Sequence, residues 1–370
     1  MLRTLITASV AIACGCLFHF KCEAQEVDFT TYNDLLERVA VLEQQNAQRP
    51  VAASQYGQGG SCGNQLSLGQ SDACCQSSSC GREGVYFMYE QVLVAPFQTN
   101  STAIIAQNDP VIEHIGFGWN MEPSNRIEFG YLGGKGCLGW RTRYWQFDHS
   151  ETLEVDSSVG LVQDEGAIVF SSTNSGDTII GVVDVDTAVM TQQIEMDVLD
   201  FELQRQFSSS FLVSGGLRMA KANQTYFAVT DSGTVNSSIN FEGFGPTLAG
   251  EFRYPVRHTR FSVYGIGRTS LLYGQQDFIA TDSDGGEVLS IPNAGQLVGN
   301  LELQLGAEYR FGKYDRCFIR TGAEAQFWSN LGSPNPSATY ADDSDEAVAD
   351  DPRGEDLGFI GLTISGGFSY

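Results

Sequence analysis

The chain has 370 residues and a formal net charge of −24, from 45 acidic and 21 basic side chains. So acidic a chain repels nucleic acid and anionic lipid, which excludes nucleic-acid-binding functions. The length allows one large domain or two ordinary ones.

Residues 1–24 have the pattern of a secretory signal peptide. Arg3 supplies the positive charge, an apolar run follows, and Cys22-Glu23-Ala24 offers a cleavage site. A lipoprotein modification at Cys14 is the alternative, but Ala11 stands where a leucine is expected. Cleavage removes two basic residues and one acidic residue, so the net charge changes from −24 to −25. Beyond Ala24 no apolar run approaches the roughly 18 residues of a membrane-spanning helix, so only strands could hold this exported chain in a membrane.

Residues 25–48 are predicted to form a short coiled-coil helix. Apolar or seam-forming side chains recur at alternating spacings of three and four residues, and an asparagine in such a seam often sets the number of helices. We expect a homo-oligomer, a trimer, through residues 28–48; the alternative is a single amphipathic helix. The seam residues are Tyr32, Leu35, Val39, Leu42 and Asn46.

Residues 49–83 form a linker rich in Gly, Ser, Gln and Cys. Of nine cysteines, Cys14, Cys16 and Cys22 leave with the signal peptide, so six remain. Export makes disulfides the expected state of the four cysteines in this linker. Zinc is the alternative, but the cluster lacks histidines and a Cys-x-x-Cys pair. The six are Cys62, Cys74, Cys75, Cys80, Cys137 and Cys317.

Residues 84–370 carry strand patterns throughout. In "LVGNLELQLGAEYRF" (297–311), apolar residues alternate with charged and polar ones over about 15 residues, which predicts an unusually long strand. Ten such strands are expected, and "AIVFSS" and "TIIGVVDV" would form a projecting hairpin or raise the number to twelve. The ten lie near 84–95, 124–132, 138–149, 190–206, 211–221, 240–254, 258–273, 296–311, 315–329 and 357–370.

The connections between these strands alternate between long and short. The long ones, 96–123, 150–189, 222–239, 274–295 and 330–356, hold 24 acidic residues and one basic residue, Arg353. A soluble β-sandwich is not expected to concentrate the acidic residues of its loops at one end. An even number of strands, with short turns at one end and long loops at the other, is typical of a transmembrane barrel. The predicted fold is therefore an all-β, antiparallel transmembrane β-barrel of ten strands, or twelve, in the outer membrane.

Several segments resemble the Legionella major outer membrane protein-like family over about residues 84–370. They are "RTRYWQFDH" (141–149), "LDFELQRQF" (199–207), "FEGFGPTLAGEFRY" (241–254), "SLLYG" (270–274) and the last strand. The resemblance implies an outer-membrane barrel described as pore-forming. It supplies no catalytic residues, and the helix and the acidic stretch "DDSDEAVADD" depart from the family pattern.

Two sets of candidate site residues follow from the barrel. The polar faces of two neighbouring strands are expected to line the lumen, where charged rings select ions, or to pair with one another and plug it. Acidic loops are candidate Ca²⁺ ligands, although a solvated negative loop is the alternative. The pore-lining candidates are Asn300, Glu302, Gln304, Glu308, Arg310, Arg316, Arg320 and Glu324. The Ca²⁺ candidates are Asp342, Asp343, Asp345, Glu346, Asp350 and Asp351, with Asp282, Asp284 and Glu287 in a second loop.

The last strand, "LGFIGLTISGGFSY", is predicted to close the barrel between 315–329 and 84–95. Its ending with Phe368 and Tyr370 fits the signal that the barrel assembly machinery recognises. No enzyme is expected. Asp148 and His149 are adjacent and point to opposite faces, whereas a dyad on one face requires residues i and i+2.

The sequence thus predicts a porin-like pore, with no cofactor, for passive diffusion of ions and small solutes. The acidic loops would favour cations by focusing the electrostatic field. The alternative is a non-conducting structural or adhesive surface protein, cross-linked through its cysteines and touching the cell wall. Expected partners are outer-membrane lipid and the assembly machinery.

Overall fold

The computed structural model describes residues 83–108, 111–134, 137–156, 165–172, 178–283, 288–336, 338–339, 348–349 and 352–370. The predicted signal peptide, the coiled-coil helix and the linker up to residue 82 lie outside these residues. Within the described part of the chain, no helix is long and apolar enough to cross a membrane.

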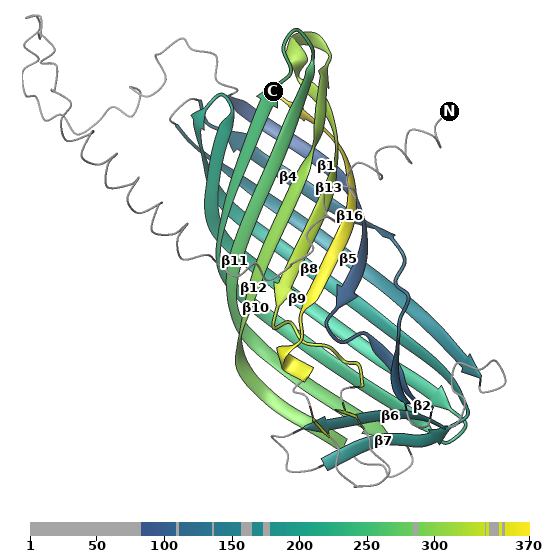
Figure 1. The fold of residues 1–370 in the computed structure, drawn as a ribbon. Coiled ribbons are helices and arrows are strands. Elements are labelled where there is room, and N and C mark those ends of the chain that lie inside the picture. Colours follow the sequence, from purple (N-terminus) through teal and green to yellow (C-terminus); the bar gives the residue numbers. More distant parts are fainter. Residues whose placement is uncertain are drawn as a thin grey trace, which may run out of the picture. The chain divides into compact units, whose positions relative to one another are not determined.

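Ten antiparallel strands form a closed barrel, as predicted (Figure 1). Around the ring the order is β1-β16-β13-β12-β11-β10-β9-β8-β5-β4. Strands that follow one another in the chain therefore pair, except where β1 and β16 close the ring and where β2, β3, β6, β7, β14 and β15 leave it. The strands are β1 (Gly84–Gln98), β4 (Glu122–Leu132), β5 (Leu138–Asp156), β8 (Thr187–Ser208), β9 (Phe211–Thr230), β10 (Thr234–Pro255), β11 (Phe261–Asp282), β12 (Val288–Phe311), β13 (Cys317–Ser329) and β16 (Leu357–Ser369).

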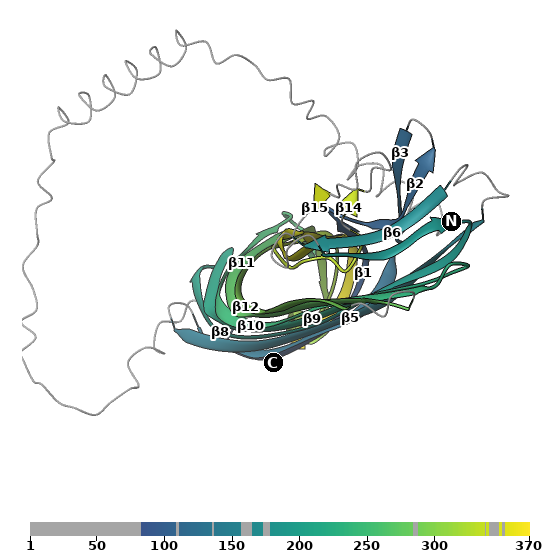
Figure 2. The same ribbon diagram turned by 90° about the horizontal axis from the view of Figure 1, so that it is seen from below.

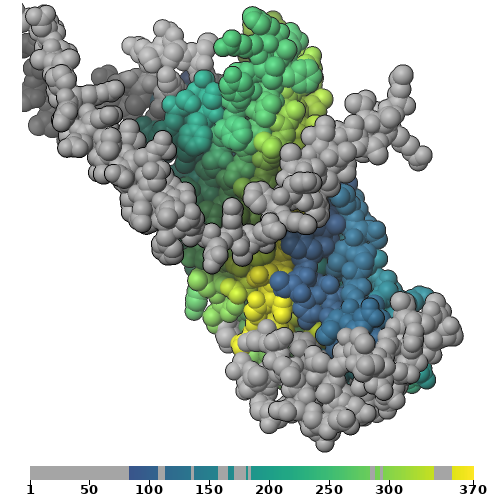
Figure 3. Space-filling view, viewed as in Figure 1, coloured from purple at the N-terminus to yellow at the C-terminus, as the bar shows by residue number. Residues whose placement is uncertain are grey.

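The last strand closes the ring, which confirms the prediction for the C-terminus. β16 pairs with β1 from Tyr86↔Ser369 to Gln98↔Leu357 and with β13 on its other side. Figure 3 shows this seam, with the blue β1 against the yellow β16. At its end Gly84 has φ +143°, and a Cβ there would lie 1.6 Å from the Tyr370 carbonyl oxygen. Closure leaves no open edge among these strands.

Side chains alternate between the two faces of the wall. On β12, Leu301, Leu303 and Leu305 are 45 %, 52 % and 59 % exposed and face outward, while Asn300 and Glu302 are buried and face the lumen. This pattern is the reverse of a soluble protein, because the apolar face is the exposed one. The predicted assignment of faces is confirmed.

The strands extend beyond their predicted ends at one end of the barrel. The predicted long loops 222–239 and 274–295 are wrong, since β9 and β10 are joined by a turn at 231–233 and β11 continues to Asp282. Period-two patterning is weak there because apolar residues such as Tyr226 face inward, while polar ones such as Asn223 and Asp277 face outward. The short turns at the other end agree with the predictions, including the one between β12 and β13 around the 3-10 turn η3 (Lys313–Asp315).

A separate four-stranded sheet lies at the end of the barrel opposite the C-terminus (Figures 1 and 2). We call this end the capped end and the other the terminal end. The sheet, in the order β3-β2-β6-β7, joins two hairpins: β2 (Thr102–Asn108) with β3 (Val111–Gly116), and β6 (Glu165–Ser172) with β7 (Thr178–Val185). The alternative of twelve barrel strands is therefore wrong, and the projecting-hairpin alternative is right. A two-stranded ribbon, β14 (Ala338–Thr339) with β15 (Val348–Ala349), and the 3-10 turn η4 (Pro352–Gly354) precede β16.

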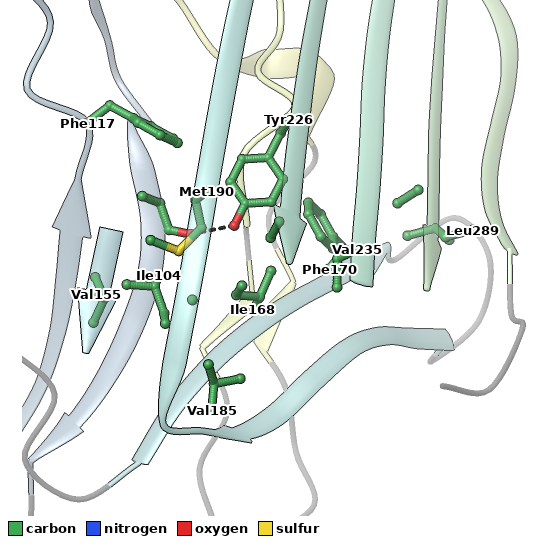
Figure 4. Packing of buried hydrophobic residues seen from close by; sticks show 14 of the residues in the cluster. Ile104, Phe117, Val155, Ile168, Phe170, Val185, Met190, Tyr226, Val235 and Leu289 are labelled. Carbon is green, nitrogen blue, oxygen red and sulfur yellow. Dashed lines mark hydrogen bonds between the residues drawn. The ribbon is translucent and has the colours of Figure 1, made fainter. Parts of the chain in front are cut away.

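The small sheet packs onto the barrel through a buried apolar cluster (Figure 4). Ile104, Ile168 and Phe170 from the sheet meet Tyr226 and Val235 from the barrel wall. The Tyr226 hydroxyl donates a hydrogen bond of 2.6 Å to the Ala103 carbonyl oxygen. The small sheet is thus held to the barrel by apolar packing and by a hydrogen bond from a wall tyrosine to the backbone of the sheet.

Removal of Phe368, Ser369 and Tyr370 should prevent the barrel from assembling. The Tyr370 amide donates to the Val85 carbonyl oxygen at 2.8 Å, and the Phe87 and Phe368 rings lie 6.0 Å apart, so the deletion frays the closing seam. Folded barrel would be measured as the heat-modifiable band on gels of unboiled samples. Replacing Ile319, an outward residue of β13, with Leu is the control. A deletion variant with a normal folded band would contradict this prediction.

Candidate functional site

The lumen contains a network of ion pairs that we call the lumen network. Among the described residues, eight arginines and eight carboxylates contribute to it from nine of the ten strands, so it is electrically balanced. The arginines are Arg126, Arg141, Arg143, Arg218, Arg253, Arg268, Arg310 and Arg320. The carboxylates are Glu90, Glu128, Asp200, Glu202, Glu251, Glu302, Glu308 and Glu324.

Arg218 is the best-coordinated side chain of the network. It is fully buried, and its Nε and Nη2 donate to the two carboxylate oxygens of Asp200 at 2.6 and 2.9 Å. Its Nη1 lies 2.7 Å from Glu302 Oε1 and also donates to the Asn300 side chain. A bidentate arginine–carboxylate pair fixes direction as well as charge. These contacts hold β8, β9 and β12 at a set distance.

Arg126 joins two further acids across the seam. Its guanidinium lies 2.5 Å from Glu90 Oε1 and 2.6 Å from Glu324 Oε1. Gln304 donates to Glu90 at 3.1 Å and to the Thr363 hydroxyl at 2.8 Å. The strands β4, β1, β13, β12 and β16 are thereby linked on the lumen side as well as through their backbones.

A third group lies near the terminal end. Glu308 accepts hydrogen bonds from Arg310 Nε at 2.5 Å and from Arg320 Nε at 2.8 Å, and Arg253 Nη2 lies 2.9 Å away. Glu251 pairs with Arg320 at 3.2 Å. Each carboxylate here serves more than one arginine, which offsets the cost of removing the charges from water.

One ion pair joins opposite walls. β5 and β12 lie five positions apart in both directions around the ring of ten, and Arg143 Nη2 on β5 lies 2.9 Å from Glu302 Oε2 on β12. The cavity left inside the network is about 30 Å³. That is room for one or two water molecules. At this level side chains from opposite walls meet across the lumen.

An aromatic layer covers the network on the side toward the capped end. Phe359 makes edge contacts with Trp145 and Phe147, with ring centroids 5.5 and 4.9 Å apart. The Arg126 and Arg218 guanidiniums lie over the rings of Trp145 and Trp328, at 5.6 and 5.7 Å. Such cation–π contacts tie the charged and apolar layers together.

The segment 330–336, which we call the inserted segment, fills the lumen beyond the aromatic layer (Figure 2). Inward-facing amides hold its backbone: Gln224 donates to the Gly332 carbonyl oxygen at 2.9 Å and Gln276 to that of Leu331 at 2.8 Å. Asn335 in turn donates to the Gln192 side chain at 3.0 Å. The prediction that 330–356 is entirely an outer acidic loop is therefore wrong at its start, since residues 331–336 are buried.

Seven of the eight predicted pore-lining residues face the lumen, and six of them are buried, with Gln304 half-buried. Arg316 differs from the prediction. It precedes β13, its side chain is exposed, and its guanidinium lies 4.4 Å from the Tyr370 ring centroid and 5.6 Å from that of Tyr314. The two residues of the predicted assembly signal face outward at the terminal end, with Phe368 49 % and Tyr370 77 % exposed.

The Ca²⁺ candidates Asp342, Asp343, Asp345, Glu346, Asp350 and Asp351 lie outside the described residues, as do Asp284 and Glu287. Asp282 is at the end of β11. Among the described residues, no group of three or more His, Cys, Asp or Glu side chains is placed to hold a metal ion.

The described histidines do not form the dyad considered from the sequence. His149 faces the lumen and its ring is tilted against that of Trp119, with centroids 5.3 Å apart, whereas Asp148 is exposed on the outer face. Glu151, two residues on, is the carboxylate on the same face, with its Oε2 3.6 Å from His149 Nε2. His258 lies in a turn with φ 63°.

Eleven of the network's sixteen charged residues were not among the pore-lining candidates. Asp200 and Glu202 alternate with Leu199, Phe201 and Leu203, so the same period of two could have identified them. What the pattern lacks is the pairing partner, because Arg143 and Glu302 are 159 residues apart in the chain.

Comparison with known proteins gives one family and several distant structures. The family model described as Legionella pneumophila major outer membrane protein precursor matches residues 139–370. Among curated proteins there is no match.

Three solved structures illustrate the distant structural similarity. The outer membrane protease OmpT from Escherichia coli has 10 % identity and a TM-score of 0.38 and covers 80 % of this chain and 99 % of its own. The translocator domain of the autotransporter NalP from Neisseria meningitidis has 10 % identity and a TM-score of 0.36, with 78 % and 88 % covered. The Pseudomonas putida toluene transporter TodX has 9 % identity and a TM-score of 0.28, with 78 % and 90 % covered. At these values none of the three carries an argument about function.

Substitution of Arg218 with Met should destabilise the barrel by about 3–5 kcal/mol, because it leaves Asp200 and Glu302 buried with fewer partners. The free energy of unfolding would be measured in detergent by urea titration. Arg205→Met is the control, since Arg205 is exposed on the outer face and should change stability by about 1 kcal/mol or less. Equal effects of the two substitutions would contradict the role assigned to the network.

Proposed function

Because this chain belongs to the Legionella major outer membrane protein family and is an outer-membrane β-barrel protein, we propose that it is a sealed barrel that anchors its capped end at the cell surface. The barrel then acts as a structural membrane protein and does not form an open pore for solutes. The structure therefore favours the non-conducting surface protein, the alternative in the sequence analysis, over the porin-like pore.

The observation that carries this proposal is the ion pair between Arg143 and Glu302, which joins opposite walls of the lumen. The cavity of about 30 Å³ beside it has room for one or two water molecules and none for a larger solute. The aromatic layer and the inserted segment add two further obstructions toward the capped end. A hydrated ion or a small solute would have to displace all three.

A gated pore is the second candidate, and the chemistry of the obstructions favours it. Well-packed apolar side chains would close the lumen as stably as buried ion pairs do. The sixteen charged side chains of the lumen network are therefore not required for a permanent plug. The inserted segment is held chiefly by amide hydrogen bonds, for which water can substitute. If these layers part, solutes pass by passive diffusion, and the acidic residues toward the capped end enrich cations.

The remaining functional expectations are part of the same proposal. The protein has no catalytic activity, it forms trimers through residues 28–48, and its cysteine cluster cross-links the surface structure. Localisation in the outer membrane brings it into contact with the lipid and the assembly machinery. Barrel assembly depends on the ending at Phe368 and Tyr370.

In planar bilayers, the full-length protein should give no conductance steps. A variant in which residues 331–335 are replaced by a Gly-Ser linker and Arg143, Glu302 and Phe359 are changed to Ser should conduct. It removes the inserted segment, the pair that spans the lumen and the ring that joins the aromatic layer. Current at fixed voltage, and the reversal potential in a salt gradient, are the measurements.

Arg205→Ser, on the outer face, is the matched control and should stay silent. Heat modifiability would establish that each variant is folded. Steps from the folded, unsubstituted protein, with preference for cations, would contradict the sealed barrel and establish the pore.

A further inference from the structure

A groove of about 450 Å³ lies on the outer face of the wall, across β10, β11, β12 and β13. Four large apolar side chains line it, Leu248, Leu271, Leu301 and Phe327, all of them 40–57 % exposed. The volume is within the range of small-molecule binding sites. We propose that this groove binds one acyl chain of an outer-leaflet lipid, in addition to the function proposed above and independently of it.

The groove follows from the order of side chains on neighbouring strands. One outward row runs Leu248–Thr269–Leu301–Phe327, and the next runs Pro246–Leu271–Gly299–Ser329. In the first row only Thr269 is small, between Leu248 and Leu301, and the second row ends in two small residues. The wall is hollow where Gly299 and Ser329 stand side by side.

The polar atoms at the groove are already satisfied within the wall. The Thr269 hydroxyl donates to the Asn300 carbonyl oxygen at 3.0 Å. The Ser329 hydroxyl accepts from the Gly299 amide at 3.2 Å and donates to the Gly299 carbonyl oxygen at 3.4 Å. The groove therefore offers carbon surface to its occupant, which suits a hydrocarbon chain and no polar ligand.

The height of the groove on the wall fits a lipid of the outer leaflet. Outward residues of β11 are apolar or small from Phe261 to Tyr273 and turn polar at Gln275 and Asp277. The groove lies at the end of this apolar band that is nearer to the capped end. Outer-membrane barrels place their short turns in the periplasm, so the capped end faces outward. A chain in the groove then has its headgroup level with Gln275.

Charge favours a lipid over a second copy of the protein. Glu242 and Asp277 face outward on β10 and β11 just beyond the groove. A symmetric dimer through this face would bring the acidic rims of both copies together, at a cost in electrostatic repulsion. A bilayer covers the band around the groove in any case, so the acyl chain is the continuation of an interface that already exists.

The test is lipid binding by the detergent-extracted, full-length protein, followed by native mass spectrometry with dioleoylphosphatidylcholine as the probe. Thr269→Phe fills the groove. Thr321→Phe is the matched control, because Thr321 is also an exposed, outward-facing threonine but lies on β13 away from the groove. Heat modifiability would establish that all three proteins are folded.

We expect one tightly retained lipid on the unsubstituted protein and on Thr321→Phe, and an apparent Kd weaker by at least about tenfold for Thr269→Phe. Equal lipid retention by all three proteins would overturn the proposal. So would a dimer of the unsubstituted protein that Thr269→Phe abolishes, since the groove would then be an interface between copies. This experiment measures lipid retention and not conductance. The proposal of a lipid groove and the proposal of a sealed barrel can therefore be contradicted independently of each other.

Discussion

The narrowness of a ten-stranded ring is the constraint on which this structure depends. The number of strands fixes the diameter, and a small barrel encloses a space that inward side chains can fill. Arginine and glutamate on opposite walls therefore touch, as Arg143 and Glu302 do at 2.9 Å. The same two side chains in a wider barrel would stand apart in water and line a channel. The diameter of the barrel therefore decides whether these charges line an open channel or meet across the lumen, and the residue types alone do not show which.

Closing the lumen with charges requires balance. Burying an arginine or a carboxylate alone costs several kcal/mol, and pairing recovers this only when geometry and hydrogen bonds are good. The network meets that requirement with equal numbers of both signs and with bidentate contacts such as Arg218 to Asp200. Because most of the pairs join different strands, the network braces the barrel from inside while the apolar outer face meets the membrane.

The two ends of the barrel differ in how they are built. At the terminal end the strands are joined by short turns, and the first and last strands meet there. At the capped end the strands extend beyond the apolar band, and their inward faces change from charged to amide and apolar residues. There they hold the inserted segment and the four-stranded cap. Layers of different chemistry therefore follow one another along the lumen, from the ion pairs through the aromatic rings to the inserted segment.

Local sequence patterning specifies the wall of the barrel. A period of two, held along strands such as 296–311, specifies which side chains face out, because successive residues of a strand point to opposite faces. Strand number, the closing strand and the lumen-facing side of Glu302, Glu308 and Arg320 followed from it. Only the tertiary structure decided what fills the lumen. The partner of Glu302 across the barrel, the burial of Leu331 to Pro336 and the groove beside Gly299 depend on register and ring size. These bring together residues far apart in the chain, and local periodicity carries no information about them.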